Sequence, residues 1–142
     1  MKLTTFQCLL LTVIIVLMIL LLYLLISQVR EKYQMDDPVL KDVRQTLLKL
    51  HPSVKDIKFM KGDKSYTINK KKIYLCLKDK DGKYYNKNML MYVTIHELAH
   101  VLCDEVGHTD KFHKIFDGLL DKAAQIGIYN PSIPLEENYC EY

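Results

Sequence analysis

The chain has 142 residues, of which 49% are hydrophobic and 26% charged, and its formal net charge of +3 combines a lysine-rich middle with an acidic C-terminal part. A continuous apolar stretch near the N-terminus removes about thirty residues from any soluble fold, and the roughly 110 that remain suffice for one core. Two independent cores would each be marginal at this length, so the sequence argues against several soluble domains.

The first predicted element is a membrane-spanning helix over residues 8–26, which contain no charge, proline or glycine. A helix of this length is about 28 Å long, close to the roughly 30 Å hydrocarbon thickness of a bilayer. A cleaved signal peptide is the alternative, but its apolar core is usually shorter and small residues follow it, whereas residues 27–30 read Ser-Gln-Val-Arg. We therefore expect an uncleaved transmembrane anchor within residues 1–30 and a single domain over residues 31–142.

Charge and cysteine content both favour the cytoplasmic side for this domain. Lys2 and the α-amino group precede the apolar segment, and a larger number of basic residues follow it: Arg30, Lys32, Lys41 and Arg44. The four cysteines show no CxxC pairing, so we expect no disulfide framework and favour a reducing compartment, with one bridge left open.

The domain begins with a helix that Asp37 caps and Pro38 opens, and apolar residues recur in it at helical spacing until residues 51–52 end it. Strand-like runs follow at residues 54–60, 65–68 and 73–77, with turn residues between them. These runs predict a small antiparallel sheet.

Two more helices complete the domain and make it α+β. Residues 88–103 are apolar nearly all round, as expected of a helix in the middle of a domain. Residues 110–126 are amphipathic, and Gly127 is placed to end that helix. The tail that follows contains two prolines and predicts irregular structure.

The buried helix contains an H-E-x-x-H motif formed by His96, Glu97 and His100. Four residues rotate about 400° around a helix, so the two histidines project from one face and can chelate one ion. Glu97 lies beside them, where its carboxylate can reach a water rather than the metal and act as a general base. Zinc suits such imidazole ligands without redox chemistry, and the motif predicts hydrolysis of peptide bonds.

A catalytic zinc site needs a third protein ligand and an open position. Asp104, Glu105, His108 and His113 all follow the motif. Asp104 lies on the same face but about 12 Å along the axis from His96, and Glu105 leaves that face. His108 ranks first because Gly107 before it permits a sharp turn back toward the motif.

The segment HELAH, followed by His108-Thr109-Asp110-Lys111-Phe112, resembles the WLM and SprT (Spartan-like) group of zinc metallopeptidases. Members of that group carry HExxH on one helix and then a third histidine, followed four residues later by an aromatic that packs the next helix. The resemblance implies His108 as third ligand, Phe112 in the core, and a compact zincin-like fold of helix, small sheet, active-site helix and supporting helix. It covers roughly residues 39–126, and its specific part lies within residues 91–116.

The resemblance also bears on substrates. The best-known members cleave proteins crosslinked to DNA, but this sequence shows a membrane anchor and no zinc finger, ubiquitin-binding module or long basic tail, so peptidase chemistry is the part that carries over. In such folds a strand beside the active-site helix pairs with an extended substrate, and we expect residues 73–77 to form it. Tyr129 and His113 are candidates for stabilising an oxyanion.

Three alternatives remain open at this point. Zinc could be structural, with Cys103 or Asp104 as a fourth protein ligand. The lysine-rich face of residues 55–87 could bind nucleic acid, although a lysine run is more often a solvated face. Cys140 could keep the enzyme latent by offering a thiolate to zinc, although a simple free cysteine is the more common case.

Overall fold

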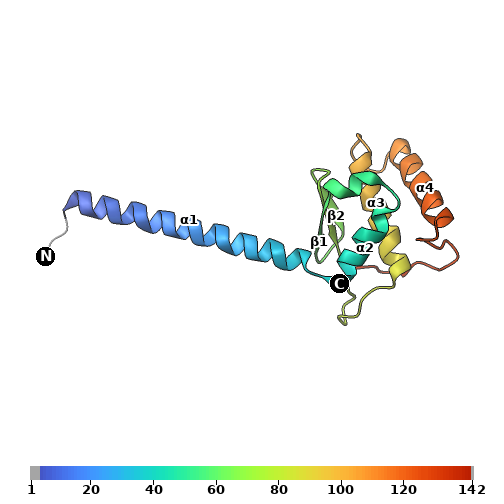
Figure 1. The fold of residues 1–142 in the computed structure, drawn as a ribbon, viewed down its shortest axis with the longest axis horizontal. Helices are drawn as coiled ribbons and strands as arrows, with labels where there is room; N and C mark the ends of the chain where they lie inside the picture. Colours follow the sequence, from blue (N-terminus) through green and yellow to red (C-terminus); the bar gives the residue numbers. More distant parts are fainter. Residues whose placement is uncertain (1–3, 142) are drawn as a thin grey trace. The chain divides into compact units, whose positions relative to one another are not determined.

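The computed structural model describes residues 4–141, and the chain forms two compact units, of which one ends at Tyr33 and the other begins at Gln34. Helix α1 makes up nearly all of the first unit. The second contains the remaining elements in the order α2, η1, β1, β2, β3, α3 and α4 (Figure 1). Helices together with one small sheet make this second unit an α+β domain, as predicted.

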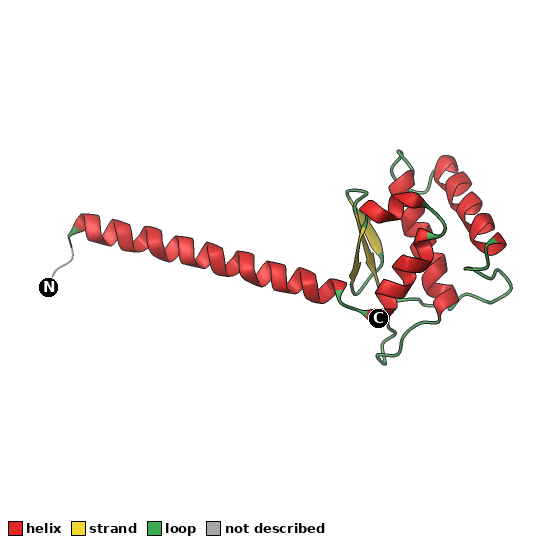
Figure 2. Ribbon diagram, viewed as in Figure 1, coloured by secondary structure: helices red, strands yellow, loops and turns green. Residues whose placement is uncertain are grey.

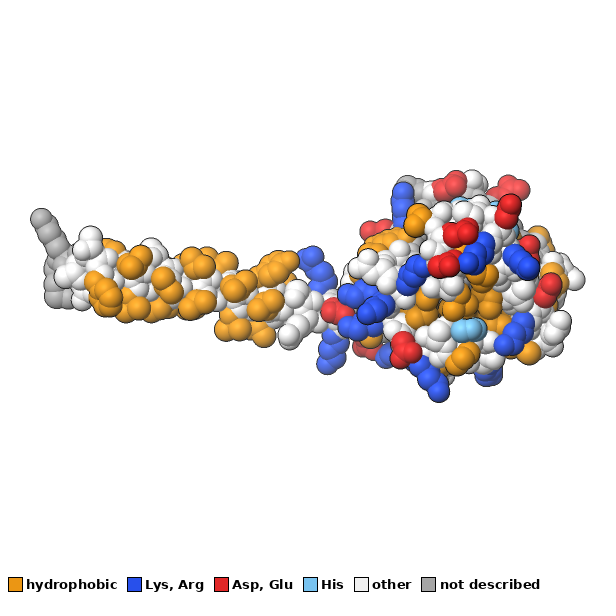
Figure 3. All heavy atoms as spheres, turned by 90° about the horizontal axis from the view of Figure 1, so that it is seen from above, with side chains coloured by type: hydrophobic (Ala, Val, Ile, Leu, Met, Phe, Trp, Pro, Cys, Tyr) orange, Lys and Arg blue, Asp and Glu red, His pale blue; other side chains and the backbone are white. Residues whose placement is uncertain are grey.

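Helix α1 (Thr5–Met35) extends beyond the predicted apolar segment at both ends. It starts early because Thr4 and Gln7 form a capping box, in which the Gln7 N–H donates to Thr4 Oγ1 at 3.3 Å and the Thr4 N–H to Gln7 Oε1 at 2.9 Å. Figure 3 shows apolar side chains along α1 and basic ones at its C-terminal end. Length and composition make α1 a candidate membrane span, and a signal sequence would meet the same criteria.

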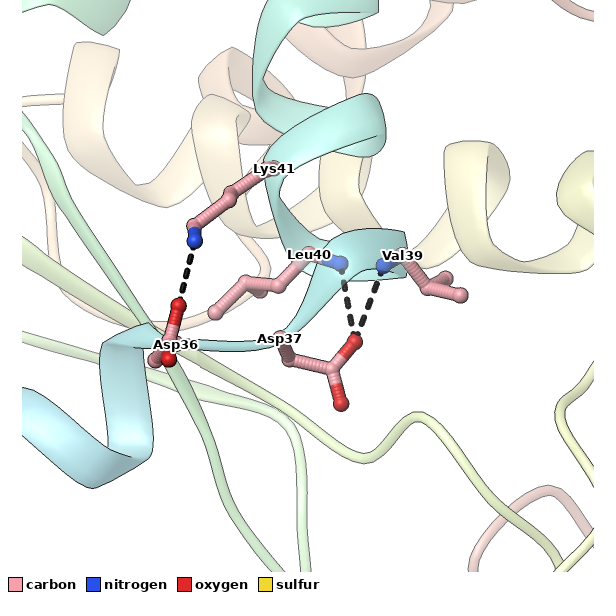
Figure 4. Close-up of polar contacts among 5 residues, drawn as sticks. All are labelled: Asp36, Asp37, Val39, Leu40 and Lys41. Atoms are coloured by element: carbon pink, nitrogen blue, oxygen red, sulfur yellow. Dashed lines mark hydrogen bonds and ion pairs between the residues drawn. The ribbon is translucent and has the colours of Figure 1, made fainter.

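Helix α2 (Pro38–Leu48) begins at the cap predicted for Asp37. Oδ1 of this carboxylate accepts from the backbone N–H groups of Val39 at 2.9 Å and Leu40 at 3.3 Å (Figure 4). Its other oxygen accepts from the hydroxyl of Tyr84 at 3.0 Å. The buried carboxylate therefore ties the start of α2 to the loop that precedes α3.

The segment after α2 is a short 3₁₀ helix, η1 (Pro52–Asp56), where the sequence predicted the start of a strand. Nδ1 of His51 accepts from the N–H of Ser53 at 3.2 Å and caps this turn. Because Pro52 supplies the first-turn backbone angle, the chain continues as a turn and the first strand begins later, at Lys58.

The sheet is mixed, so the prediction of a wholly antiparallel sheet was wrong. Strands β1 (Lys58–Lys61), β2 (Tyr66–Ile68) and β3 (Lys72–Leu75) lie in the order β1-β3-β2. β3 pairs antiparallel with β2 and parallel with β1. The chain reverses between β1 and β2 and again between β2 and β3, so β1 and β3 run the same way. They become neighbours because β3 inserts between the other two strands.

The turn between β2 and β3 explains why these two strands form a hairpin. Asn69 and Lys70 have φ angles of 50° and 55°, and the N–H of Lys71 donates to the carbonyl of Ile68 at 3.0 Å. Two consecutive left-handed residues are the mark of a type I′ turn, whose twist matches that of paired strands. The hairpin leaves β2 at one edge of the sheet.

Helices α3 (Lys87–Leu102) and α4 (Asp110–Gln125) agree with the predicted helices to within one residue at each end. α3 contacts α4, α2 and the sheet, and so occupies the middle of the domain (Figures 1 and 2). Gly127 follows α4 with a φ of 74°, the left-handed conformation expected of a residue that ends a helix. The core draws fully buried side chains from all of these layers, among them Leu47, Ile73, Leu98 and Phe112.

Candidate metal centre

The centre of the site is the middle of α3, where His96 and His100 lie one helical turn apart. The centroids of their rings are 4.9 Å apart, and both side chains are partly exposed. Ile95, Leu98 and Ala99 between and beside them are fully buried. Burial of these neighbours fixes the rotation of the helix about its axis, so the two imidazoles are presented together at one face.

His108 joins them from the loop between α3 and α4. Gly107 has a φ of 85°, so the chain takes the left-handed turn there that its sequence predicted. Nε2 of His108 lies 3.0 Å from Nε2 of His96 and 3.1 Å from Nε2 of His100. The Thr109 side chain then caps α4, which keeps His108 at the entrance to that helix.

The three histidines lie close enough to bind one metal ion, because their ligand nitrogens are all within 4.8 Å of one another. Three nitrogens around a tetrahedral zinc, each about 2.0–2.1 Å from the metal, stand roughly 3.3 Å apart, which is near the separations given above. The ring of Phe112 packs against all three imidazoles, with centroid distances of 5.0 Å to His96, 4.3 Å to His100 and 4.8 Å to His108. This buried ring restricts their side-chain rotation.

Burial also holds two of these imidazoles in the neutral form that binds metals. Desolvation, followed by the neighbouring rings of His100, His108 and His113, lowers the pKa of His96 to about 4. Desolvation and then His108 lower the pKa of His100. A neutral imidazole keeps a free lone pair, so the donor set fits a cation.

The other candidate ligands named from the sequence lie elsewhere. The carboxylate of Asp104 pairs with Lys111 at 2.6 Å, and this ion pair lowers the pKa of Asp104. Glu105 is exposed, and Cys103 is buried in the hydrophobic core. The ring of His113 is 6.3 Å from that of His108, centroid to centroid. Within residues 4–141, the cluster of potential ligands at this place consists of the three histidines alone.

Glu97 is buried beside the cluster and receives a hydrogen bond that the sequence did not predict. The hydroxyl of Thr67 on β2 donates to Oε2 of Glu97 at 2.7 Å and also lies 3.2 Å from its backbone carbonyl. Burial raises the pKa of Glu97, and the bond from Thr67 opposes that rise. Thr67 therefore orients the carboxylate. No local pattern identifies it, because the pairing depends on how β2 docks on α3.

A cavity of about 570 Å³ opens next to this carboxylate, and His96 and Glu97 line one side of it. Residues 73–77, the strand expected along the cleft, instead include the central strand β3, which is hydrogen-bonded on both sides. Of the two edge strands, β1 and β2, it is β2 that contacts Glu97. The prediction of residues 73–77 as the substrate-pairing strand was wrong because both edges of β3 are already paired with other strands.

The lining of this cavity also includes Cys140, which forms a disulfide with Cys76. The latency hypothesis for Cys140 is therefore wrong, because a disulfide sulfur offers no thiolate to a metal. The bridge also weakens the cytoplasmic assignment, since disulfides persist mainly in oxidising compartments. The charge count on either side of the apolar segment is then the remaining indication of orientation.

The remaining sequence candidates have other surroundings. Tyr129 packs on Tyr92, with ring centroids 6.0 Å apart, and burial raises its pKa. In the lysine-rich face, Lys87 pairs with Asp42 at 2.8 Å and Lys78 lies 4.5 Å from the centroid of the Tyr84 ring. Nucleic-acid binding by this face stays a prediction, which a steep fall in DNA affinity with salt would support.

Comparison with known proteins gives relatives from viruses. Uncharacterized proteins of Invertebrate iridescent virus 6 and Invertebrate iridescent virus 3 are 56% identical over 88 residues and 50% over 86 residues; each match covers 60% of this chain, and 49% and 54% of those proteins. An uncharacterized protein of Acanthamoeba polyphaga mimivirus is 45% identical over 80 residues, which is 55% of this chain and 40% of that protein. The chain thus spans about half the length of the curated relatives it matches. No family model matches it, and no solved structure does.

Proposed function

We propose that the domain is a zinc-dependent metalloendopeptidase of the HExxH type, tethered to a membrane by α1. The observation that carries the proposal is the convergence of three imidazole nitrogens next to the buried carboxylate of Glu97, which together with His96 lines a cavity. A helix with only a structural role would need neither two histidines four residues apart nor a buried glutamate between them. The zinc-peptidase resemblance of the sequence points in the same direction.

His96, His100 and His108 would hold the metal, and a fourth protein ligand is absent from the part of the chain described here. A zinc ion bound there would act as a Lewis acid, lowering the pKa of a water toward about 7. Glu97 would take the proton of the attacking water and later deliver it to the leaving amine. Burial raises the pKa of Glu97, which favours its acceptance of a proton in this exchange.

The free edge of β2 would orient an extended substrate backbone by strand addition. β2 also carries Thr67, which holds the Glu97 carboxylate. One strand would thus place both the peptide and the general base, so a small movement of β2 would affect binding and catalysis together.

Replacing Glu97 by Gln tests the peptidase assignment. The variant keeps the side chain's volume but loses the proton acceptor, so turnover of a casein substrate should fall about 10²–10⁴-fold while zinc content and thermal stability stay close to wild type. Glu105→Gln, which alters an exposed acid in the following loop, is the matched control and should keep its activity. Full activity in Glu97→Gln would refute the assignment, and loss of zinc with unfolding would favour a structural site.

The tether has its own test, because more basic residues follow the apolar segment 8–26 than precede it. The charge count predicts that protease treatment of sealed vesicles digests the C-terminal domain from the cytoplasmic side, whereas the Cys76–Cys140 bridge predicts protection. Complete protection would reverse the orientation. A mature N-terminus near Ser27 would show instead that the apolar segment is a cleaved signal.

A further inference from the structure

The cavity beside the candidate metal centre has a wall that the peptidase chemistry does not explain. Helix α3 lines it through Tyr92, Val93, His96 and Glu97, and the C-terminal segment 139–141 lines it as well. Lys64 and Ser65 complete the lining. With a volume of about 570 Å³ and the side chains of Tyr92, Val93 and Tyr139 around it, the cavity has room for a large apolar side chain.

Tyr139 and Cys140 attach the C-terminal segment to the domain. The hydroxyl of Tyr139 contacts Ser65 Oγ at 2.9 Å and donates to the carbonyl of Cys76. Its ring packs on Tyr85, with centroids 4.7 Å apart, and Tyr85 Oη accepts from the N–H of Cys140 at 2.9 Å. The preceding residues 131–138 are all exposed. The wall is therefore held by Tyr139, by the disulfide from Cys140 to Cys76 and, earlier in the tail, by the Glu136 carboxylate, which accepts from Asn86 Nδ2 at 2.6 Å.

The backbone of this segment has conformations that need such support. Asn138 and Cys140 have φ angles of 57° and 53°. The left-handed region costs an ordinary L-residue roughly 1–2 kcal/mol, although asparagine tolerates it better than most. A cysteine side chain gives no such tolerance, and Cys140 is held in this conformation by the disulfide to Cys76 together with the hydrogen bond from its N–H to Tyr85 Oη.

We propose that this cavity is the pocket for a large apolar substrate side chain next to the scissile bond, and that the Cys76–Cys140 disulfide keeps its wall in position. The proposal rests on the proposed peptidase function and names a substrate class and a control for the same site. Reduction by a dithiol breaks the S–S bond, leaves one thiol on each cysteine and converts the dithiol to its own disulfide. Residues 139–141 are then held only by non-covalent contacts such as those of Tyr139, the wall is no longer fixed in position, and the selectivity for a large side chain is lost.

Binding measurements on the full-length, zinc-loaded Glu97→Gln protein in detergent test this without turnover. Two fluorescent peptides are compared that differ in one residue beside the scissile bond, phenylalanine or alanine. With the disulfide intact, the phenylalanine peptide should bind at least about tenfold more tightly, as is typical of a fitted apolar pocket. In the Cys76→Ser/Cys140→Ser variant, or after reduction, the two affinities should agree within about threefold, while Cys8→Ser should leave the preference unchanged.

Equal affinities for the phenylalanine and alanine peptides with the disulfide intact would show that the cavity is not the pocket for this side chain. A preference for phenylalanine that persists after the disulfide is removed would show that the bridge does not maintain the pocket. If the double cysteine variant does not fold, Val93→Phe replaces it: filling the cavity from α3 should abolish the preference for phenylalanine, and an unchanged preference would again overturn the proposal. Because no step in these assays needs hydrolysis, the result is separate from that of Glu97→Gln in the turnover assay, which decides the peptidase function.

Discussion

The two walls of the cavity beside Glu97 are made in opposite ways. The α3 wall consists of residues close together in the chain, whose relative positions follow from the pitch of one helix. The C-terminal wall is brought to it by a disulfide between cysteines separated by 64 residues and by Tyr139, which reaches Ser65 across the domain. One part of the site is thus determined by a single helix, α3, whereas the C-terminal part forms only when the whole domain has folded.

The largest effect is expected for His108, which lies in the loop after α3 and joins the two histidines of that helix. His108→Ala removes one of three imidazoles and should reduce zinc affinity by more than about 100-fold, since even outer partners of metal ligands are worth 10–100-fold. His113→Ala, five residues later on the first turns of α4, is the matched control and should bind zinc like wild type. Zinc competition with a chromophoric chelator measures both, and equal affinities would remove His108 from the site.

A smaller effect is expected at the turn that delivers His108. An alanine at Gly107 meets no atom within 4 Å, so its cost is confined to the backbone φ of 85° and should be about 1–2 kcal/mol of stability. Gly118→Ala is the matched control: that residue lies inside α4, also with open space around it, and alanine should stabilise the helix by roughly 0.5–1 kcal/mol. Urea unfolding of both variants gives the comparison, and stabilisation by Gly107→Ala would contradict the geometry of this loop.

The smallest effect is expected for the hydrogen bond from Thr67 on β2 to the carboxylate of Glu97 on α3. Thr67→Val keeps the shape of the side chain but removes the hydroxyl, and we expect the turnover number to fall roughly tenfold, in line with about 1.4 kcal/mol for a hydrogen bond to a charged group. Thr67→Ser should restore most of the activity. An equal loss in both variants would show that the threonine methyl group packs the strand and that the hydroxyl does not position the base.

These regions also mark the limit of what the sequence predicts. His96, Glu97 and His100 follow from helical spacing, and the start of α2 follows from the capping chemistry of Asp37. Gly107 indicated where the chain turns, which left His108 as the best third candidate. All of these are short-range signals, and each element concerned appears in the structure where it was expected.

The errors arose from long-range pairing. Nothing within residues 58–75 reveals that β3 enters between β1 and β2, and that insertion decides both the parallel pair and the identity of the edge strand. The partner of Cys140 is likewise undetermined, because four cysteines permit several pairings and spacing does not choose among them. Thr67 could be identified as a functional candidate only from the packing of β2 on α3, which brings its hydroxyl to Glu97.

The Cys76–Cys140 bond closes a covalent ring that contains the candidate metal ligands and the general base. All three histidines and Glu97 lie between the two cysteines, on a loop whose ends are 64 residues apart. Closing a loop of this length lowers the entropy of the unfolded chain by an amount worth about 4 kcal/mol in the chain-entropy view. An unfolded but oxidised molecule would therefore keep its ligands in a restricted volume, and a single cut in the exposed stretch 131–138 would leave both fragments joined.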